Sequence, residues 1–166
     1  MTPEIRERAS DPRAQLQGAL DLSFSFLGHR DRTEAEVRRH LERKRVEPSA
    51  IDAAVAELER LGYLDDARFA RRFVEDRRRL DAWGADRIER RLTALGVERA
   101  TFAAALAGDG GDAHDELSAA VALLRRRIAR PPRTDRERER ALGLLGRRGY
   151  EVELAYDAVR AFERDG

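Results

Sequence analysis

Residues 37–55 read VRRHLERKRVEPSAIDAAV, and the spacing of their apolar side chains returns twice further along the chain. The five apolar positions recur 51 residues later in residues 88–106, and 53 residues beyond those in residues 141–159. The three sets are Val37, Leu41, Val46, Ile51 and Val55, then Ile88, Leu92, Val97, Phe102 and Leu106, then Ala141, Leu145, Tyr150, Ala155 and Val159. Apolar side chains four residues apart are typical of one face of a helix. The pattern therefore predicts a tandem repeat of helices.

Composition supports helices throughout the 166 residues. Alanine and leucine number 27 and 19, against 17 for isoleucine, valine and threonine together, and this balance favours helix over strand. The absence of cysteine excludes disulfides, thiolate metal sites and a cysteine nucleophile. No apolar run approaches the roughly 18 residues that a membrane span needs, and the first residues are too charged for a secretory signal. We therefore expect a cytoplasmic protein with no membrane segment.

Helix boundaries are indicated by capping residues and by glycine and proline. Thr33 and Glu36 have the spacing of a capping box, and Asp65 and Asp66 are placed to cap the helix that follows them. Gly108–Asp112 has the composition of a flexible linker. Helices are expected near residues 14–27, 33–45, 49–61, 65–80, 88–95, 102–106, 117–128, 134–148 and 152–162.

These helices divide into three modules. Residues 1–13 are expected to be a disordered lead-in, followed by three-helix modules over 14–64, 65–108 and 109–166. Tandem modules contact mainly their neighbours. The predicted fold is therefore all-α, with about nine helices in three tandem three-helix modules that form an elongated, curved array.

Catalytic and cofactor motifs are missing from the sequence. The three histidines lack metal-ligand spacing, no serine lies in a nucleophile-elbow motif, and no phosphate-binding glycine loop is present. Asp65 and Asp66 would be the only acid–base pair, and helix capping explains both. We expect no enzymatic activity, no cofactor and no metal.

Basic residues are segregated along the chain. Arg77, Arg78 and Arg79 precede Trp83, and Arg87, Arg90 and Arg91 follow it. Residues 125–148, which begin with Arg125, Arg126 and Arg127, hold ten arginines and three acidic residues, a local charge of +7 in a chain whose net charge is +1. Such surfaces attract phosphate backbones or acidic protein surfaces. Arginines near helix ends also complement the helix dipole and aid solubility, and the residues favour neither interpretation.

The segment Leu61-Gly62-Tyr63-Leu64-Asp65-Asp66-Ala67-Arg68-Phe69-Ala70 resembles the RecX family of bacterial recombinase regulators. Residues 33–37 with Leu41 are similar to the first module of that family. The similarity to its middle module continues through Phe73, Arg77, Gly84, Ile88, Leu92 and Leu95-Gly96-Val97. The resemblance covers residues 14–164 and is weakest in the arginine-rich third module.

The resemblance implies a non-enzymatic regulator, most often an inhibitor, of the RecA recombinase. Members of the family bind the groove of the RecA filament on single-stranded DNA and modulate ATP hydrolysis, strand exchange and coprotease activity, and so act in DNA recombination, DNA repair and the SOS response. We accordingly expect RecA as the partner, a monomer, and weak binding to DNA by itself. The residues expected to contact the filament or its DNA are Arg77, Arg78, Arg79, Arg87, Arg90, Arg91, Arg125, Arg126 and Arg127.

A direct DNA-binding protein is the alternative. Residues 33–45 and 49–61 have lengths suited to a helix-turn-helix. The helix that would read bases begins Ser49-Ala50-Ile51-Asp52-Ala53-Ala54-Val55-Ala56-Glu57, which offers no arginine or asparagine to base edges. This sequence disfavours the alternative.

Overall fold

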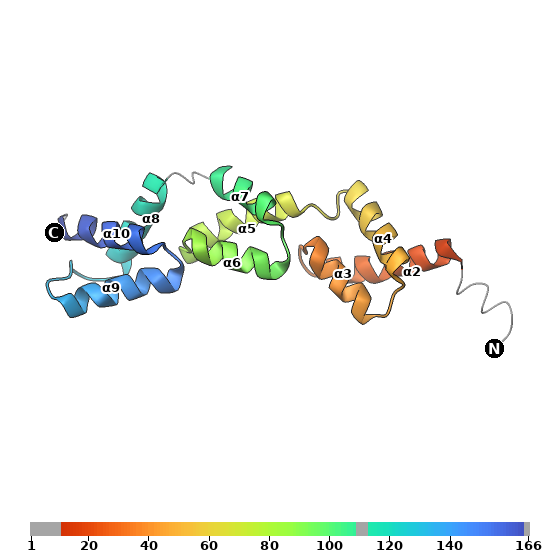
Figure 1. The fold of residues 1–166 in the computed structure, drawn as a ribbon, viewed down its shortest axis with the longest axis horizontal. Coiled ribbons are helices and arrows are strands. Elements are labelled where there is room, and N and C mark those ends of the chain that lie inside the picture. Colours follow the sequence, from red (N-terminus) through yellow and green to blue (C-terminus); the bar gives the residue numbers. More distant parts are fainter. Residues whose placement is uncertain (1–10, 109–112, 165–166) are drawn as a thin grey trace. The chain divides into compact units, whose positions relative to one another are not determined.

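The computed structural model describes residues 11–108 and 113–164, and over these ranges it contains α-helices and no strand (Figure 1). The described helices are α2 (Pro12–Leu27), α3 (Glu34–Arg43), α4 (Pro48–Arg60), α5 (Asp66–Asp81), α6 (Ala85–Leu95), α7 (Arg99–Gly108), α8 (Ala113–Arg127), α9 (Asp135–Arg148) and α10 (Val152–Arg164). The all-α class and the number of about nine helices are confirmed. Residues 1–10 of the expected lead-in and residues 109–112 of the expected linker lie outside the described part of the chain.

Helix α2 begins two residues before its expected start. Asp11 is its N-cap, and its carboxylate accepts a hydrogen bond of 3.0 Å from the backbone N–H of Arg13. Pro12 occupies the first helical position, where its fixed φ favours the helix and its missing N–H costs no hydrogen bond. Proline in this stretch therefore starts the helix rather than interrupting it.

The chain forms two compact units. One extends up to Phe69 and includes Leu95–Val97, and the other holds Ala70–Ala94 and the residues from Glu98 onward. The division into modules at 14–64, 65–108 and 109–166 stays a prediction.

In the first unit, α2 packs against both α3 and α4. The core is formed by Ala19, Val37, Leu41, Ala50, Ile51, Ala54, Val55, Leu58 and Leu64. The capping box expected at Thr33 is present: its hydroxyl accepts from the N–H of Glu36, and the Glu36 carboxylate accepts from the N–H of Thr33. The helix start at this point is thus fixed by local side chains.

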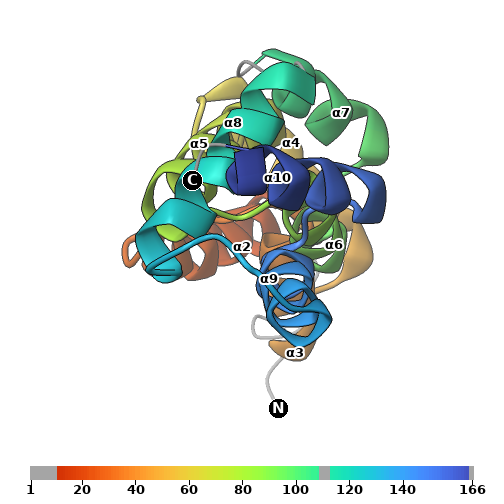
Figure 2. The ribbon, with the colours of Figure 1, turned by 90° about the vertical axis from the view of Figure 1, so that its left-hand side faces the viewer.

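In the second unit, α10 packs against α8 and α9 (Figure 2). The core there includes Leu123, Leu124, Leu145, Val159 and Phe162. Across both units, thirteen of the fifteen repeat positions are buried, and Val46 and Leu106 are partly buried. The repeated apolar spacing in the sequence therefore corresponds to the residues that form the protein interior.

The N-termini of α3 and α6 are held by equivalent sets of contacts. Within the first unit, the Thr33 hydroxyl donates to the carbonyl of Leu95 at 2.7 Å, and the N–H of Glu34 donates to the carboxylate of Asp66 at 2.9 Å. Arg39 adds a second donor to the Leu95 carbonyl at 3.1 Å. The start of α3 thus meets residue 95 at the end of one helix and an acidic residue at the start of another.

Within the second unit, the same arrangement recurs at the start of α6. The N–H of Gly84 donates to the carbonyl of Arg148 at 2.8 Å, and the N–H of Asp86 donates to the carbonyl of Gly149 at 3.1 Å. Between them, the N–H of Ala85 donates to the carboxylate of Glu116 at 2.7 Å. Glu116 on α8 therefore plays the part for α6 that Asp66 on α5 plays for α3. We call these two sets of contacts the Asp66 junction and the Glu116 junction.

The prediction that Asp65 and Asp66 both cap the helix after them is wrong for Asp66. Asp65 does cap α5, since its carboxylate accepts from the N–H of Arg68 at 2.8 Å. The Asp66 carboxylate instead accepts from Glu34 at the start of α3. Burial disfavours its ionised form and raises its pKa, although the hydrogen bond from Glu34 acts in the opposite direction. A contact across 32 residues leaves no local signal in the sequence.

The close approach at the Glu116 junction requires glycine. Gly149 ends α9 in the left-handed region, with φ of 84°, and a Cβ there would overlap the Cβ of Arg87. A Cβ on Gly84 would overlap the backbone of Gly149 and Tyr150. The two helix ends can therefore meet only while both positions lack a side chain.

Candidate functional site

The turn between α5 and α6 positions the single tryptophan of the chain. After α5 ends at Asp81, Ala82 takes a positive φ of 51° and its side chain is buried. The N–H of Trp83 then donates to the carbonyl of Arg77 at 3.1 Å. The Trp83 ring meets the ring of Phe73 edge to face, with centroids 6.2 Å apart. Trp83 is thereby held half-buried at the surface of the second unit.

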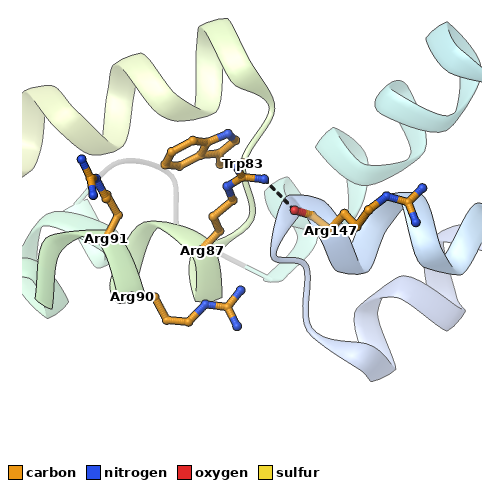
Figure 3. A pocket seen from close by; sticks show the side chains of 5 residues that line it. All are labelled: Trp83, Arg87, Arg90, Arg91 and Arg147. Atoms are coloured by element: carbon orange, nitrogen blue, oxygen red, sulfur yellow. Dashed lines mark hydrogen bonds between the residues drawn. The ribbon is translucent and has the colours of Figure 1, made fainter. Parts of the chain in front are cut away.

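Arg87 lies against Trp83 and reaches from α6 to α9. Its guanidinium carbon is 4.3 Å from the Trp83 ring centroid, within the range of a cation–π interaction. The same guanidinium donates a hydrogen bond of 2.7 Å to the backbone carbonyl of Arg147 (Figure 3). These two contacts fix the half-buried Arg87 side chain in one orientation.

A basic pocket surrounds this pair. It has a volume of about 540 Å³ and is lined by Trp83, Arg87, Arg90, Arg91 and Arg147. Arg87, Arg90 and Arg91 extend from α6 and Arg147 from the last turn of α9 (Figure 3). None of its lining residues is acidic. We call this site the Trp83 pocket.

The positive charge of the Trp83 pocket comes from side chains. The N–H groups of Gly84, Ala85 and Asp86 at the start of α6 already donate to Arg148, Glu116 and Gly149 respectively. These three donors are therefore not available to an anion, as they would be at an open helix N-terminus. Guanidinium groups alone provide the attraction, and they suit the oxygens of phosphate and carboxylate.

The arginines before Trp83 occupy different environments from those after it. Arg77 lies 5.5 Å from the Trp83 ring centroid, yet it is paired with Asp81 at 2.5 Å. Arg79 lies 3.4 Å from Asp76. Arg78 is half-buried in the last turn of α5. None of the three lines the pocket, and Asp81 and Asp76 offset two of the charges.

Arg125, Arg126 and Arg127 are exposed in the last turn of α8, in the position that complements the helix dipole. They do not line the Trp83 pocket. The fold therefore brings together three of the nine predicted contact residues.

Arg147 was not among the predicted contact residues. It belongs to the arginine-rich segment 125–148, and this was its only signal in the sequence. Its place beside Arg87, 60 residues earlier, depends on the docking of α6 against α9.

The remaining chemistry of the described residues is limited. Over residues 11–108 and 113–164, no group of three or more His, Asp or Glu side chains could hold a metal ion. Of the helices that the structure describes, none has the length and apolar character to cross a membrane. The arrangement in the Trp83 pocket can bind anions.

Comparison with known protein families identifies two matching segments. Residues 19–58 match the first three-helix domain of RecX, and residues 65–106 match its second three-helix domain. The Trp83 pocket takes four of its five lining residues from the second of these segments.

Similar proteins cover most of the chain. A regulatory protein RecX from Stenotrophomonas maltophilia (strain K279a) is 32% identical over 159 residues, which are 95% of this chain and 93% of the relative. Another, from Thermobifida fusca (strain YX), is 34% identical over 144 residues, 86% of this chain and 77% of the relative. The crystal structure of RecX from Lactobacillus salivarius shares the fold, with a TM-score of 0.78, 15% identity, and coverage of 90% of this chain and 97% of the other. This chain belongs to the RecX family.

Proposed function

We propose that this protein is a non-enzymatic regulator of the RecA recombinase, acting as an inhibitor in the cytoplasm as a monomer. It binds the groove of the RecA filament on single-stranded DNA and modulates ATP hydrolysis, strand exchange and coprotease activity. Its similarity over nearly the full length of proteins named regulatory protein RecX carries this proposal.

The arrangement of charges supports binding to a filament. Many exposed arginines of this chain have carboxylate partners, such as Arg138 with Glu163 at 2.6 Å. The arginines of the Trp83 pocket are instead gathered without an acidic residue among the lining side chains. Uncompensated charge of this kind favours encounter with a polyanion such as the nucleoprotein filament.

A regulator acts on the filament by binding one of its states more tightly than another. A chain of tandem modules that contacts several neighbouring protomers divides its binding energy over many contacts, and those contacts exist together only in the assembled filament. Binding therefore shifts the filament toward the state that fits it, and occupancy of the groove obstructs incoming duplex DNA.

The proposal is tested by measuring ATP hydrolysis by RecA on single-stranded DNA while this protein is titrated from well below stoichiometry. We expect the rate of hydrolysis to fall. A fall at ratios far below one per RecA protomer indicates capping or destabilisation of the polymer, and a fall near saturation indicates occupancy of the groove. An unchanged rate at every ratio, with binding to DNA alone, would instead support the direct DNA-binding alternative.

The pairing of charged side chains on α4 disfavours the helix-turn-helix alternative. In α4, the helix that would read bases, Arg60 is paired with Glu57 of the same helix at 2.7 Å. Asp52 on this helix is likewise paired, with Arg38 of α3. An acidic helix whose arginine is neutralised is poorly suited to the major groove.

A further inference from the structure

We propose that the Trp83 pocket binds the sugar–phosphate backbone of single-stranded DNA. The proposed function does not say whether these arginines contact protein or DNA. This inference rests on that function and assigns the pocket to the DNA strand. It concerns only side chains of the second unit.

The first argument is the unbalanced charge. Arg90, Arg91 and Arg147 are exposed, and none of them has a carboxylate partner among the described residues. Asp86 and Glu89 lie on the same helix but line a neighbouring pocket, where Glu89 pairs with Arg99. With Arg87 included, α6 presents three guanidinium groups at the Trp83 pocket, whereas the Arg147 side chain extends away from Arg87 (Figure 3) and its guanidinium lies beside Gly143, one turn back along α9. Such a concentration of uncompensated positive charge attracts anions.

The second argument is the spacing of anions that suits three neighbouring guanidinium groups. A nucleic-acid strand supplies one phosphate for every nucleotide, so one continuous ligand can reach several of these groups at once. A single protein carboxylate can pair with two guanidinium groups, as Glu36 does with Arg30 and Arg32, but it does not continue as a chain of evenly spaced charges. The opening of about 540 Å³ is also far larger than one carboxylate. Charge density therefore favours a nucleic-acid strand over an acidic protein surface.

The third argument is the aromatic ring among the arginines. Proteins that bind single strands combine a basic groove with aromatic or guanidinium planes on which bases stack. Trp83 and Arg87 form a cation–π pair that provides both kinds of plane, and the hydrogen bond from Arg87 to the Arg147 carbonyl holds it in place. A duplex keeps its bases paired inside, so this platform favours a single strand. Arg87 is a positioning residue here, while Arg90 and Arg91 contact phosphates.

Trp83 is the only tryptophan, so its fluorescence reports on the pocket without labelling. The test titrates the full chain with an oligothymidylate of about 20 nucleotides at several salt concentrations. The variant replaces the two exposed arginines of α6, Arg90→Gln and Arg91→Gln. A control with the same change of net charge carries Arg43→Gln and Arg71→Gln, which are exposed and outside the pocket.

We expect the oligonucleotide to change the Trp83 fluorescence of the wild type and of the control. Each single-strand phosphate contact contributes about 0.7 to the slope of log affinity against log salt, so the pocket variant should lose about 1.4 from that slope. Its affinity at low salt should fall roughly tenfold, because two charge-assisted contacts are removed. All four substituted positions are exposed, and the circular dichroism of each variant checks that it is folded.

Three results would overturn the inference. The first is an equal loss of affinity in the control, which would show that net charge alone drives binding. The second is a pocket variant whose fluorescence response to the oligonucleotide and whose salt dependence of affinity equal those of the wild type. The third is binding of polyglutamate as tightly as the oligonucleotide, which would assign the pocket to acidic protein surfaces. Inhibition of RecA by the wild type is measured separately. If the protein binds the oligonucleotide but does not inhibit RecA, the proposed function is refuted and the assignment of the pocket still holds.

Discussion

Replacing Gly149 by alanine should destabilise the protein more than the same replacement at Gly62. Both glycines have left-handed backbones, with φ of 84° and 77°. An alanine at Gly62 would enter open space, whereas at Gly149 its Cβ would overlap Arg87. The pair therefore separates the cost of backbone strain from the cost of opening the Glu116 junction.

The magnitudes follow from the contacts of the junction. Left-handed strain costs about 1–2 kcal/mol for a residue with a Cβ, and both variants share it. Opening the junction at Gly149 also breaks the hydrogen bonds from Gly84 to Arg148 and from Asp86 to Gly149. At about 0.5–1.5 kcal/mol each, these add roughly 1–3 kcal/mol. For a chain of this length, an additional 2 kcal/mol lowers the Tm by about 4–8 °C.

Thermal unfolding followed by far-ultraviolet circular dichroism and by Trp83 fluorescence measures this difference. Gly84→Ala supplies an independent check, because that position carries no left-handed strain and its Cβ would overlap backbone atoms of Gly149 and Tyr150. We expect Gly84→Ala to lower the Tm through the junction alone. Equal Tm values for Gly149→Ala and Gly62→Ala, with no effect of Gly84→Ala, would refute the reasoning.

Three further predictions concern Asp66, Tyr150 and the shape of the molecule. Burial raises the folded-state pKa of Asp66, so the free energy of unfolding should decrease as pH rises through that pKa. The Asp66→Asn variant keeps an accepting oxygen without the charge, so its free energy of unfolding at neutral pH should equal or exceed that of the wild type. Asp66→Ala removes the acceptor for Glu34 and should lower the free energy of unfolding by about 1 kcal/mol in denaturant titrations, and equal stability of the Asn and Ala variants would contradict the capping role. Burial, with Glu116 nearby, raises the pKa of Tyr150 to about 12, so stability should fall between pH 10 and 12, where the phenol ionises in the unfolded chain but stays protonated in the folded one. An alkaline absorbance titration checks this, and a Tyr150→Phe variant that retains the transition near pH 12 would be evidence against it. The predicted elongated array should give a radius of gyration in small-angle scattering well above the roughly 15 Å of a compact chain of this length, and a value near 15 Å would argue against it.

The helices were predictable because their causes are local. Apolar side chains four residues apart, and capping residues such as Thr33 and Asp65, each act within one or two turns. The same local reasoning argues against Arg77 as a residue that contacts the filament or its DNA. Asp81 lies four residues later, and this spacing favours an ion pair on a helix.

The contacts between elements could not be predicted from the sequence. Asp66 reaches Glu34, Glu116 reaches Ala85, and Arg87 reaches Arg147, all across more than thirty residues. Each contact depends on how helix ends dock, which periodicity within one helix does not encode. The Trp83 pocket was for this reason foreseen only as a group of arginines around an aromatic residue, without Arg147.

Sedimentation of RecA filaments tests the central claim most directly. RecA is assembled on single-stranded DNA with a slowly hydrolysed nucleotide and pelleted with this protein present, and the pellet is compared with one from DNA alone. The account predicts that the protein enters the pellet with filaments at concentrations too low for binding to bare DNA. Equal recovery with filaments and with bare DNA, or none with filaments, would contradict it.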